Sequence, residues 1–306
     1  MPYTYPPAPG VLTGNTYSAS RFLNQPAFVQ RVLRTIAQQR FIADVLLSGR
    51  VRASGGAVMY EVSEPIYADR KPEAVSPGGD YPMSGIPTGL PALAVTSKWG
   101  SGTEITDEQI TRSNMDPVNR AMRKIINQMV ATIDGLFLSA IGAAVTQTQP
   151  ATSAWSTIST ANILLDANLA KAKINGLNQG YSPDTLVIGD TLGAYLLSDR
   201  NIIAGLGREG NAPVTVSANV PVIGDLRILV SPNLPAGVNA LVLDSNALGS
   251  VAYEQIESPG YAGDPSTTVE TKVIRDDKRD RWLLQARRPV APMIQEPNAA
   301  CVITGA

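Results

Sequence analysis

The stretch EPIYADRKPEAVSPGGDYPM, from Glu64 to Met83, has a proline or glycine every few positions. It lies between two segments, Val58–Val62 and Leu93–Trp99, in which residue types alternate with the period of a β-strand. We expect these segments to be the legs of one long hairpin, each with eight to ten strand residues and a reach of roughly 30 Å. Prolines oppose regular pairing between the legs, so the extended chain should lie on another molecule. They are Pro65, Pro72, Pro77, Pro82, Pro87 and Pro91.

The strongest helix pattern in the chain is DPVNRAMRKIINQMVATIDGLFLSAIGAAV, residues 116–145. Asp116 suits the N-cap and Pro117 the first helical position. Apolar residues recur every three or four positions, which predicts one buried stripe on a rod of about 45 Å. The polar residues opposite are expected to meet solvent or a polar partner: Arg120, Arg123, Lys124, Asn127, Gln128 and Asp134.

Composition excludes several classes of function. The 306 residues are 44% hydrophobic and 17% charged, which is typical of a folded protein, and the net charge of −1 provides no overall attraction for nucleic acid. The chain has no histidine, so Ser-His-Asp and Cys-His catalysis and His-ligated metals are excluded. The single cysteine, Cys301, excludes an internal disulfide. No stretch resembles a membrane span or a signal peptide, and we expect a cytosolic product.

Patterns that could indicate an enzyme are weak. Asp184 with Asp190, or Glu254 with Glu257, could form a carboxylate pair, but turn and cap roles are favoured. A strand, a Gly-Asp turn and a helix occur around Gly189, but the glycines fit no nucleotide-binding motif. Aspartates lie among the C-terminal arginines, which favours salt bridges over a phosphate site. Those arginines are Arg275, Arg279, Arg281, Arg287 and Arg288.

The order of the predicted elements completes the pattern. Residues 1–24 form an extended arm, and a short amphipathic helix begins near Pro26 and ends before Gly49. The elements after the long helix are a helix over 163–174, a strand and helix within 182–199, strands at 226–230 and 240–243, two strands joined by the turn 276–280, and a last strand in AACVITG.

An arm, a Pro-rich hairpin, a long spine helix, an α/β module and returning strands, in this order, resemble the major capsid proteins of tailed phages. This is the Hong Kong 97 fold, which encapsulin compartments also use. The resemblance covers nearly the whole chain and implies an α+β fold. The implied parts are an N-terminal arm and short helix (1–49), an E-loop (50–103), a P-domain with the spine helix (104–179), an A-domain (180–253) and P-domain return strands with the C-terminus (254–306).

The resemblance also implies which residues meet other subunits. The hairpin would be the E-loop lying across a neighbouring subunit, and Arg208 and Glu209 would lie in a loop near the five- and six-fold axes. The implied interface residues are Tyr5, Asp69, Arg70, Lys71, Tyr81, Arg123, Arg208, Glu209, Arg279 and Arg281. No catalytic residue, metal or cofactor is implied.

The function implied is that of a structural, non-enzymatic subunit. Copies would assemble as pentamers and hexamers into the icosahedral head around the double-stranded DNA of a tailed phage, in the cytoplasm of the host bacterium. A separate scaffolding protein, a portal and a decorating protein are candidate partners, packaged DNA would be contacted without sequence recognition, and no membrane is involved. The chain starts without a scaffolding segment, so a separate scaffold assists or none is needed. An encapsulin-like shell and an unrelated α/β enzyme remain the alternatives.

Some relatives join an E-loop lysine to a P-domain asparagine of another subunit. Lys71 and Asn298 supply these residue types, and Glu296 is the carboxylate nearest Asn298 in sequence. Charged neighbours surround Lys71, which suits a solvated salt bridge better than a desolvated nucleophile. We therefore expect non-covalent shells.

Overall fold

The computed structural model describes residues 41–113, 116–157, 159–199, 222–223, 225–263 and 268–306. The expected arm at 1–24 and the start of the helix after Pro26 lie outside these residues, and so does the side chain of Asp116. The described residues fall into two compact units. Unit 1 contains Lys98–Val130 and Gln255–Pro289, and unit 2 contains Phe41–Ser97, Ala131–Glu254 and Val290–Ala306.

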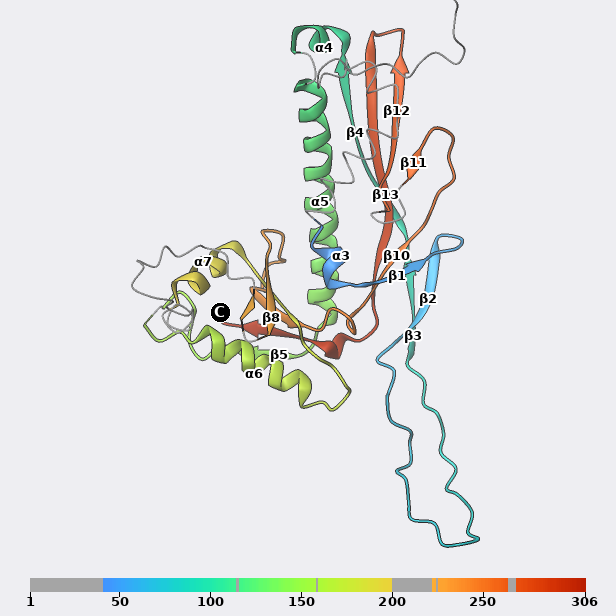
Figure 1. The fold of residues 1–306 in the computed structure, drawn as a ribbon, viewed down its shortest axis with the longest axis vertical. Helices are drawn as coiled ribbons and strands as arrows, with labels where there is room; N and C mark the ends of the chain where they lie inside the picture. Colours follow the sequence, from blue (N-terminus) through green and yellow to red (C-terminus); the bar gives the residue numbers. More distant parts are fainter. Residues whose placement is uncertain (1–40, 114–115, 158, 200–221, 224, 264–267) are drawn as a thin grey trace, which may run out of the picture. The chain divides into compact units, whose positions relative to one another are not determined.

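Unit 1 is built on an antiparallel hairpin. Strands β12 (Glu270–Asp276) and β13 (Arg281–Ile294) pair from Glu270 opposite Arg287 to Asp276 opposite Arg281, so the predicted charged turn at 276–280 is confirmed. Strand β11 (Ala262–Gly263) extends this sheet beside β12, and β4 (Ser97–Thr106) pairs with β13 (Figure 1). Helix α4 (Asp107–Ser113) follows β4 directly.

Unit 2 contains a six-stranded mixed sheet in the order β5-β14-β9-β6-β8-β7. The predicted strands at 226–230 and 240–243 are confirmed with these bounds, and the predicted strand and helix within 182–199 are confirmed as β6 and α7. Helix α6 packs on the sheet with the residues that recur along one face, Ile163, Ala167, Ala170 and Ile174. The elements are β5 (Thr148–Pro150), α6 (Ile163–Asn175), β6 (Thr185–Ile188), α7 (Asp190–Ser198), β7 (Val222–Ile223), β8 (Leu226–Val230), β9 (Ala240–Leu243), η1 (Pro297–Ala299) and β14 (Ala300–Thr304).

A smaller group of elements completes unit 2. Strand β1 (Gly49–Arg52) runs parallel to β10 (Gly249–Tyr253), and β10 pairs with the last five residues of β13. Strand β13 therefore pairs with β12 through its first half and with β10 through its second half. Helix α3 (Ala43–Leu46) precedes β1.

The spine helix α5 runs from Asp116 to Ala144, as the sequence predicts, and its 29 residues make a rod of about 44 Å. The apolar stripe is buried at Val118, Met122, Ile125 and Ile133. The segment Pro117–Ala144 is long and apolar enough to cross a membrane, although the sequence analysis predicts no membrane span. Its apolar stripe is buried within the protein, as in the core helix of a globular protein.

Asp134 corrects the prediction for the polar face of α5. The sequence places its carboxylate on the wet face, but the residue is fully buried. Its oxygens accept hydrogen bonds from the backbone N–H groups of Ile42 (3.2 Å) and Ala43 (3.1 Å), where α3 begins. A helix start has backbone N–H groups without helical partners, and a carboxylate satisfies them well. Because the partner lies about 90 residues away in the chain, no local pattern indicates it.

Replacing Asp134 by alanine should destabilise the fold. The buried N–H groups of α3 would lose their acceptor, at a cost of about 3 kcal/mol in the free energy of unfolding. Denaturant unfolding of the variant followed by circular dichroism measures this cost. Asp134→Asn, which keeps one oxygen acceptor, should lose less, and an unchanged midpoint for Asp134→Ala would contradict this assignment.

The predicted hairpin forms, but with shorter strands than expected. Strands β2 (Ala57–Val62) and β3 (Leu90–Val95) pair over six residues each, and Pro91 lies inside β3 opposite Glu61. The expected strand Leu93–Trp99 is divided at Thr96, where the chain passes from β3, which pairs with β2, to β4, which pairs with β13. The Thr96 backbone N–H donates to the carbonyl of Gly56 at 2.9 Å. Residues 63–89, here named the tongue, contain no helix or strand.

Candidate assembly surface

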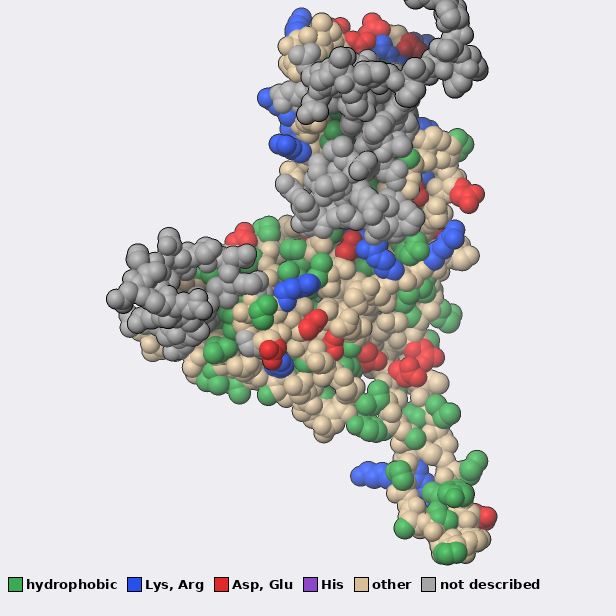
Figure 2. Space-filling model, viewed as in Figure 1, with side chains coloured by type: hydrophobic (Ala, Val, Ile, Leu, Met, Phe, Trp, Pro, Cys, Tyr) green, Lys and Arg blue, Asp and Glu red, His purple; other side chains and the backbone are tan. Residues whose placement is uncertain are grey.

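The tongue exposes large apolar side chains that the chain itself does not cover. Tyr81, Met83 and Ile86 on the returning leg are 81%, 88% and 89% exposed, and Ile66 and Tyr67 on the outgoing leg are more than half exposed. Figure 2 shows hydrophobic side chains gathered on this part of the molecule. Singly exposed apolar residues are ordinary, but a contiguous group indicates a binding surface.

The root of the hairpin has one packed and one bare face. Val58 and Tyr60 pack against a small core of Ala94, Ala252 and Met293. On the other face Met59 lies opposite Leu93 in the strand register, and both side chains are mostly exposed. Val95 continues this face and is also exposed. The bare face therefore continues the apolar surface of the tongue.

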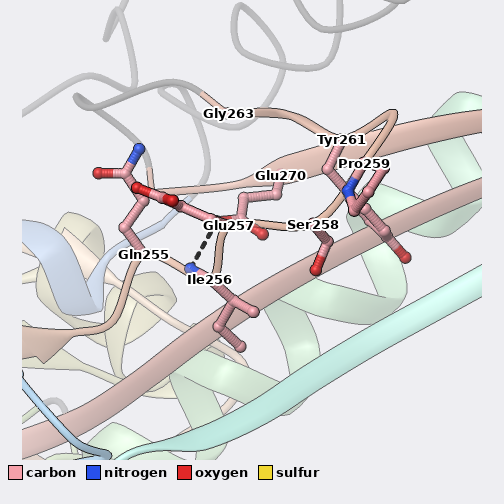
Figure 3. Close-up of a pocket in the computed structure, with 8 residues that line it drawn as sticks. All are labelled: Gln255, Ile256, Glu257, Ser258, Pro259, Tyr261, Gly263 and Glu270. Atoms are coloured by element: carbon pink, nitrogen blue, oxygen red, sulfur yellow. Dashed lines mark hydrogen bonds between the residues drawn. The ribbon is translucent and has the colours of Figure 1, made fainter.

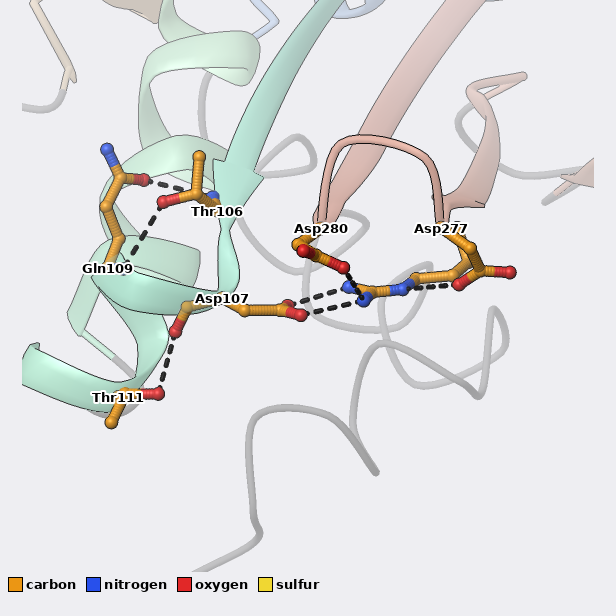
Figure 4. A network of polar contacts seen from close by, with 7 residues as sticks. Thr106, Asp107, Gln109, Thr111, Asp277 and Asp280 are labelled. Atoms are coloured by element: carbon orange, nitrogen blue, oxygen red, sulfur yellow. Dashed lines mark hydrogen bonds and ion pairs between the residues drawn. The ribbon is translucent and has the colours of Figure 1, made fainter.

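The described end of unit 1 at the β12–β13 turn is a network of ion pairs (Figure 4). Both oxygens of Asp107 contact the Arg275 guanidinium at 2.7 Å, in a bidentate pair. Asp277 (2.9 Å) and Asp280 (3.7 Å) contact the same guanidinium. Thr106 and Gln109 form reciprocal side chain to backbone hydrogen bonds of 3.3 Å, a capping box that starts α4.

The electrostatics of this network follow from these contacts. The hydrogen bond from Arg275 holds the pKa of Asp107 below its usual value, and the pKa of Arg275 is raised in turn by its hydrogen bond with Asp107. Arg281 pairs with Asp276 (2.9 Å) and with Glu104. The prediction that these arginines form salt bridges is thus confirmed for Arg275 and Arg281.

A pocket of about 500 Å³ in unit 1 is lined by two carboxylates, those of Glu257 and Glu270 (Figure 3). The Glu270 carboxylate accepts hydrogen bonds from the Ile256 backbone N–H (3.3 Å) and from Arg287 Nε (2.6 Å). Arg287 is buried and also stacks 3.7 Å from the centre of the Tyr261 ring. The Glu270 carboxylate is therefore paired with Arg287, and Glu257 is exposed at the pocket.

A second pocket, of about 550 Å³, lies in unit 2 beside Gly189 at the start of α7. Leu234, Pro235 and Val238 give it an apolar wall, and the described residues that line it include no lysine or arginine. This composition does not suit a phosphate group, so the nucleotide interpretation of the Gly-Asp turn receives no support.

Of the four carboxylates considered for catalysis, Asp184 and Glu254 have structural partners. Asp184 accepts hydrogen bonds from the Ser245 backbone N–H (2.9 Å) and hydroxyl (2.6 Å), and Glu254 accepts one from Thr96 (2.9 Å). Asp190 lies in the first turn of α7. Among the described residues, no group of three or more Cys, Asp or Glu side chains could hold a metal ion.

The structure places the predicted interface residues in separate groups. Asp69, Arg70, Lys71 and Tyr81 are exposed on the tongue, where Arg70 forms a bidentate pair with Glu73. Arg123 is exposed on α5, Arg279 is exposed in the β12–β13 turn, and Arg281 is half-buried. Tyr5, Arg208 and Glu209 lie outside the described residues. The sequence prediction missed Met59, Leu93, Met83 and Ile86. Met59 and Leu93 lie in short runs in which every residue is apolar, so both faces of the predicted strand are apolar, and this was the available signal for these two residues.

Comparisons with known proteins show the family to which the chain belongs. A family model described as phage capsid protein matches residues 90–303, which is more than half of the chain. The chain belongs to the phage capsid protein family. A search of the curated proteins found no match to this capsid protein.

Solved structures show which fold this capsid protein has. A chain from Microbacterium phage Oxtober96 is 15% identical with a TM-score of 0.57, and 87% of this chain matches 91% of that one. A capsid chain of cyanophage P-SCSP1u is 15% identical with a TM-score of 0.60, and 87% of this chain matches 88% of that one. A chain of a virus-like particle from Pyrococcus furiosus is 12% identical with a TM-score of 0.57, and 90% of this chain matches 97% of that one. These likenesses confirm the predicted α+β fold of the Hong Kong 97 type.

Together, family and fold identify a structural protein of the phage virion, and the resemblance drawn from the order of elements is confirmed. It is a major capsid protein of a tailed phage, whose copies assemble into a shell of capsomers. The encapsulin-like alternative is not better supported, because the matching family model is that of phage capsids.

The Asp107–Arg275 pair should make the stability of unit 1 depend on pH. The pKa of Asp107 is lower in the folded chain, so the unfolded chain takes up the proton first as the pH falls. The stabilisation is therefore present above the ordinary carboxyl pKa of about 4 and is lost as the pH falls through the lowered value. Thermal melts of the unassembled chain and of Asp107→Asn should show a higher Tm for the unsubstituted chain at neutral pH, and the difference should shrink as the pH falls through the lowered pKa of Asp107.

Asp80→Asn is the matched control for this measurement. Asp80 is an exposed carboxylate of the tongue for which the described contacts include no ion pair, so its substitution should leave Tm unchanged at every pH. A Tm difference for Asp107→Asn that persisted in acid would refute the ion-pair explanation.

Proposed function

We propose that this capsid protein assembles as pentamers and hexamers that close into the icosahedral head around the double-stranded DNA of a tailed phage. The observation that carries the proposal is the tongue, whose apolar side chains have no intramolecular cover. A second copy of the chain is the partner that is always present in a shell. Removing Tyr81, Met83 and Ile86 from water would each contribute on the order of 1–2 kcal/mol, and every contact is repeated around the capsomer.

We assign the parts of the chain on the same basis. Residues 1–49 serve as the N-terminal arm and short helix, 50–103 as the E-loop, 104–179 and 254–306 as the P-domain, and 180–253 as the A-domain at the symmetry axes. The tongue then lies across a neighbouring subunit. The proposed interface consists of Tyr5, Asp69, Arg70, Lys71, Tyr81, Arg123, Arg208, Glu209, Arg279 and Arg281, to which the structure leads us to add Met59, Met83, Ile86 and Leu93.

Contacts with other components follow from charge. The net charge of −1 and the pairing of Arg275 and Arg281 with acidic residues support a wall that confines DNA without binding it tightly. Assembly takes place in the host cytoplasm, with a portal and, where they occur, a separate scaffolding and a decorating protein. The shell subunit has no catalytic role in this proposal.

The virus-like particle from Pyrococcus furiosus keeps a second function in view, an encapsulin-like compartment. The content of purified particles separates the two functions. Packaged DNA and a single tail vertex support the phage head, and a protein cargo without DNA supports the compartment.

Replacing the apolar side chains of the tongue should abolish assembly and leave the fold intact. Tyr81, Met83 and Ile86 changed together to serine remove the apolar contact, while their exposure means that the subunit itself loses little packing. Light scattering should show at least a tenfold lower yield of shells, with an unchanged circular dichroism spectrum.

Ser76→Ala with Thr88→Ala is the control, since it alters exposed polar residues of the same segment. It should assemble normally, and deletion of residues 65–87 should behave like the triple serine variant. Shells of normal yield from the triple variant would show that the tongue is not the assembly surface.

The mature shell should contain no covalent link between subunits. Of the groups considered for an isopeptide bond, Glu296 already accepts hydrogen bonds from the Tyr181 hydroxyl and from the Glu64 backbone N–H, so both of its carboxylate oxygens have partners. Particles boiled in detergent should therefore run as one band at the chain mass of 32.3 kDa. A ladder of linked multimers, lost in a Lys71→Arg variant, would contradict this expectation.

A further inference from the structure

The tongue leaves the body of unit 2 at a strained residue. Ser63, directly after β2, has a φ of +56°, in the left-handed region that costs a non-glycine residue roughly 1 kcal/mol. Its backbone N–H donates to the carbonyl of Gln295 at 2.8 Å. Strain of this kind persists where surrounding contacts hold it, and it is often found at functional sites.

Polar side chains hold the next residues of the outgoing leg. One oxygen of Glu296 accepts from the Glu64 backbone N–H (3.2 Å), and the other accepts from the Tyr181 hydroxyl (2.8 Å). The Tyr67 hydroxyl donates to the carbonyl of Asn178 at 2.5 Å. All of these residues belong to unit 2. Three contacts thus hold the outgoing leg: the backbone carbonyl of Gln295, the carboxylate of Glu296 and the hydrogen bond of the Tyr67 hydroxyl.

Tyr181 lies between two acceptors. Burial raises the pKa of its phenol, and the hydrogen bond to Glu296 raises the pKa further, so the hydroxyl keeps its proton throughout the physiological range. The hydroxyl lies 2.8 Å from a Glu296 oxygen and 2.7 Å from the side-chain oxygen of Gln179, so its single proton is shared between these two acceptors.

Among the described contacts, the returning leg is tied to β2 at its root and to the outgoing leg farther out. The Gly89 backbone N–H donates to Glu61 (3.1 Å), and the Arg70 backbone N–H donates to the Ser84 hydroxyl (3.1 Å). A side chain on residue 89 would lie 2.8 Å from the carbonyl of Val62, so glycine permits the close approach of the legs. Holding the outgoing leg thus directs the whole tongue.

We propose that Glu296, Tyr181 and Tyr67 form a root latch that sets the direction of the tongue and so positions its apolar side chains for the neighbouring subunit. This inference rests on the proposed function, in which the tongue is the assembly surface. Thirteen extended residues reach about 40 Å, so a swing of 10° at the root displaces the end by about 7 Å. The displacement shrinks toward the root, to about 5 Å at Tyr81 and about 2 Å at Ile86, and shifts of this size would misalign these side chains with a fixed partner.

Distances measured by electron paramagnetic resonance test the latch in unassembled subunits. Spin labels on Ser76→Cys in the tongue and Ala172→Cys on the exposed side of α6 report its direction, in chains diluted tenfold with unlabelled protein. Cys301 is fully buried and burial raises the pKa of its thiol, so it should not take up label. The distance distribution should be narrow in the parent chain and at least twice as wide in Tyr181→Phe and in Glu296→Gln.

Shell yield, measured on the same variants without labels, links direction to assembly. Both variants should lose at least threefold in yield with unchanged circular dichroism, and Tyr67→Phe, which alters an exposed residue, should show the same trend. Tyr60→Phe is the matched control, because this hydroxyl of the same hairpin has no hydrogen-bond partner among the described contacts. It should match the parent chain in both measurements.

The outcomes separate the latch from the proposed function. Distributions of parental width in Tyr181→Phe and Glu296→Gln overturn the latch even if shells form normally. Widened distributions with parental shell yield overturn its role in positioning. If the parent chain forms no shells, or if the triple serine variant forms them with parental yield, the proposed function fails. The widths of the distance distributions still decide whether the latch exists.

Discussion

Hydrogen bonding along β13 is the interaction on which the described structure depends most. Residues 281–287 of β13 pair with β12 in unit 1, and residues 290–294 pair with β10 in unit 2, which in turn pairs with β1. A strand of this length within a sheet needs residues that tolerate burial on both faces over its second half, and Val290–Ile294 provides them. Without β13, β12 would lose its antiparallel partner, and the small core beneath β2 and β3 would lose Ala291 and Met293.

The sequence predicts the elements whose period lies within one segment. The spine helix, the strands at 226–230 and 240–243 and the charged turn at 276–280 agree with the structure because each pattern is local. Asp134 shows the limit. Its spacing on α5 is that of a solvent-facing residue, and only the distant start of α3 explains its burial. Residues 93–99 show a second limit, since their continuous strand pattern covers parts of two strands, β3 and β4, that pair with different partners.

The candidate surface was predictable in position but not in chemistry. The prolines indicate a segment without intramolecular pairing, and the structure agrees. The residues of that segment chosen from sequence are Asp69, Arg70, Lys71 and Tyr81. Three of them are charged, yet Arg70 is paired with Glu73, and the most exposed large hydrophobic side chains are Met83 and Ile86. The contacts of Glu296 and Tyr181 at the root join residues more than 100 positions apart, which no periodicity reveals.

The exposure of the tongue also makes its sensitivity to proteases a measure of whether a subunit is free or assembled. The peptide bond after Arg70 lies in a segment without secondary structure, which is the kind of site that proteases cut first, whereas the bond after Lys71 precedes proline. In a free subunit trypsin can reach Arg70, and in a shell where the tongue lies on a neighbour it cannot. Cleavage after Arg70 would then divide the chain into two fragments of very unequal size. The fraction of cleaved chains in a partial digestion would measure the fraction of unassembled subunits.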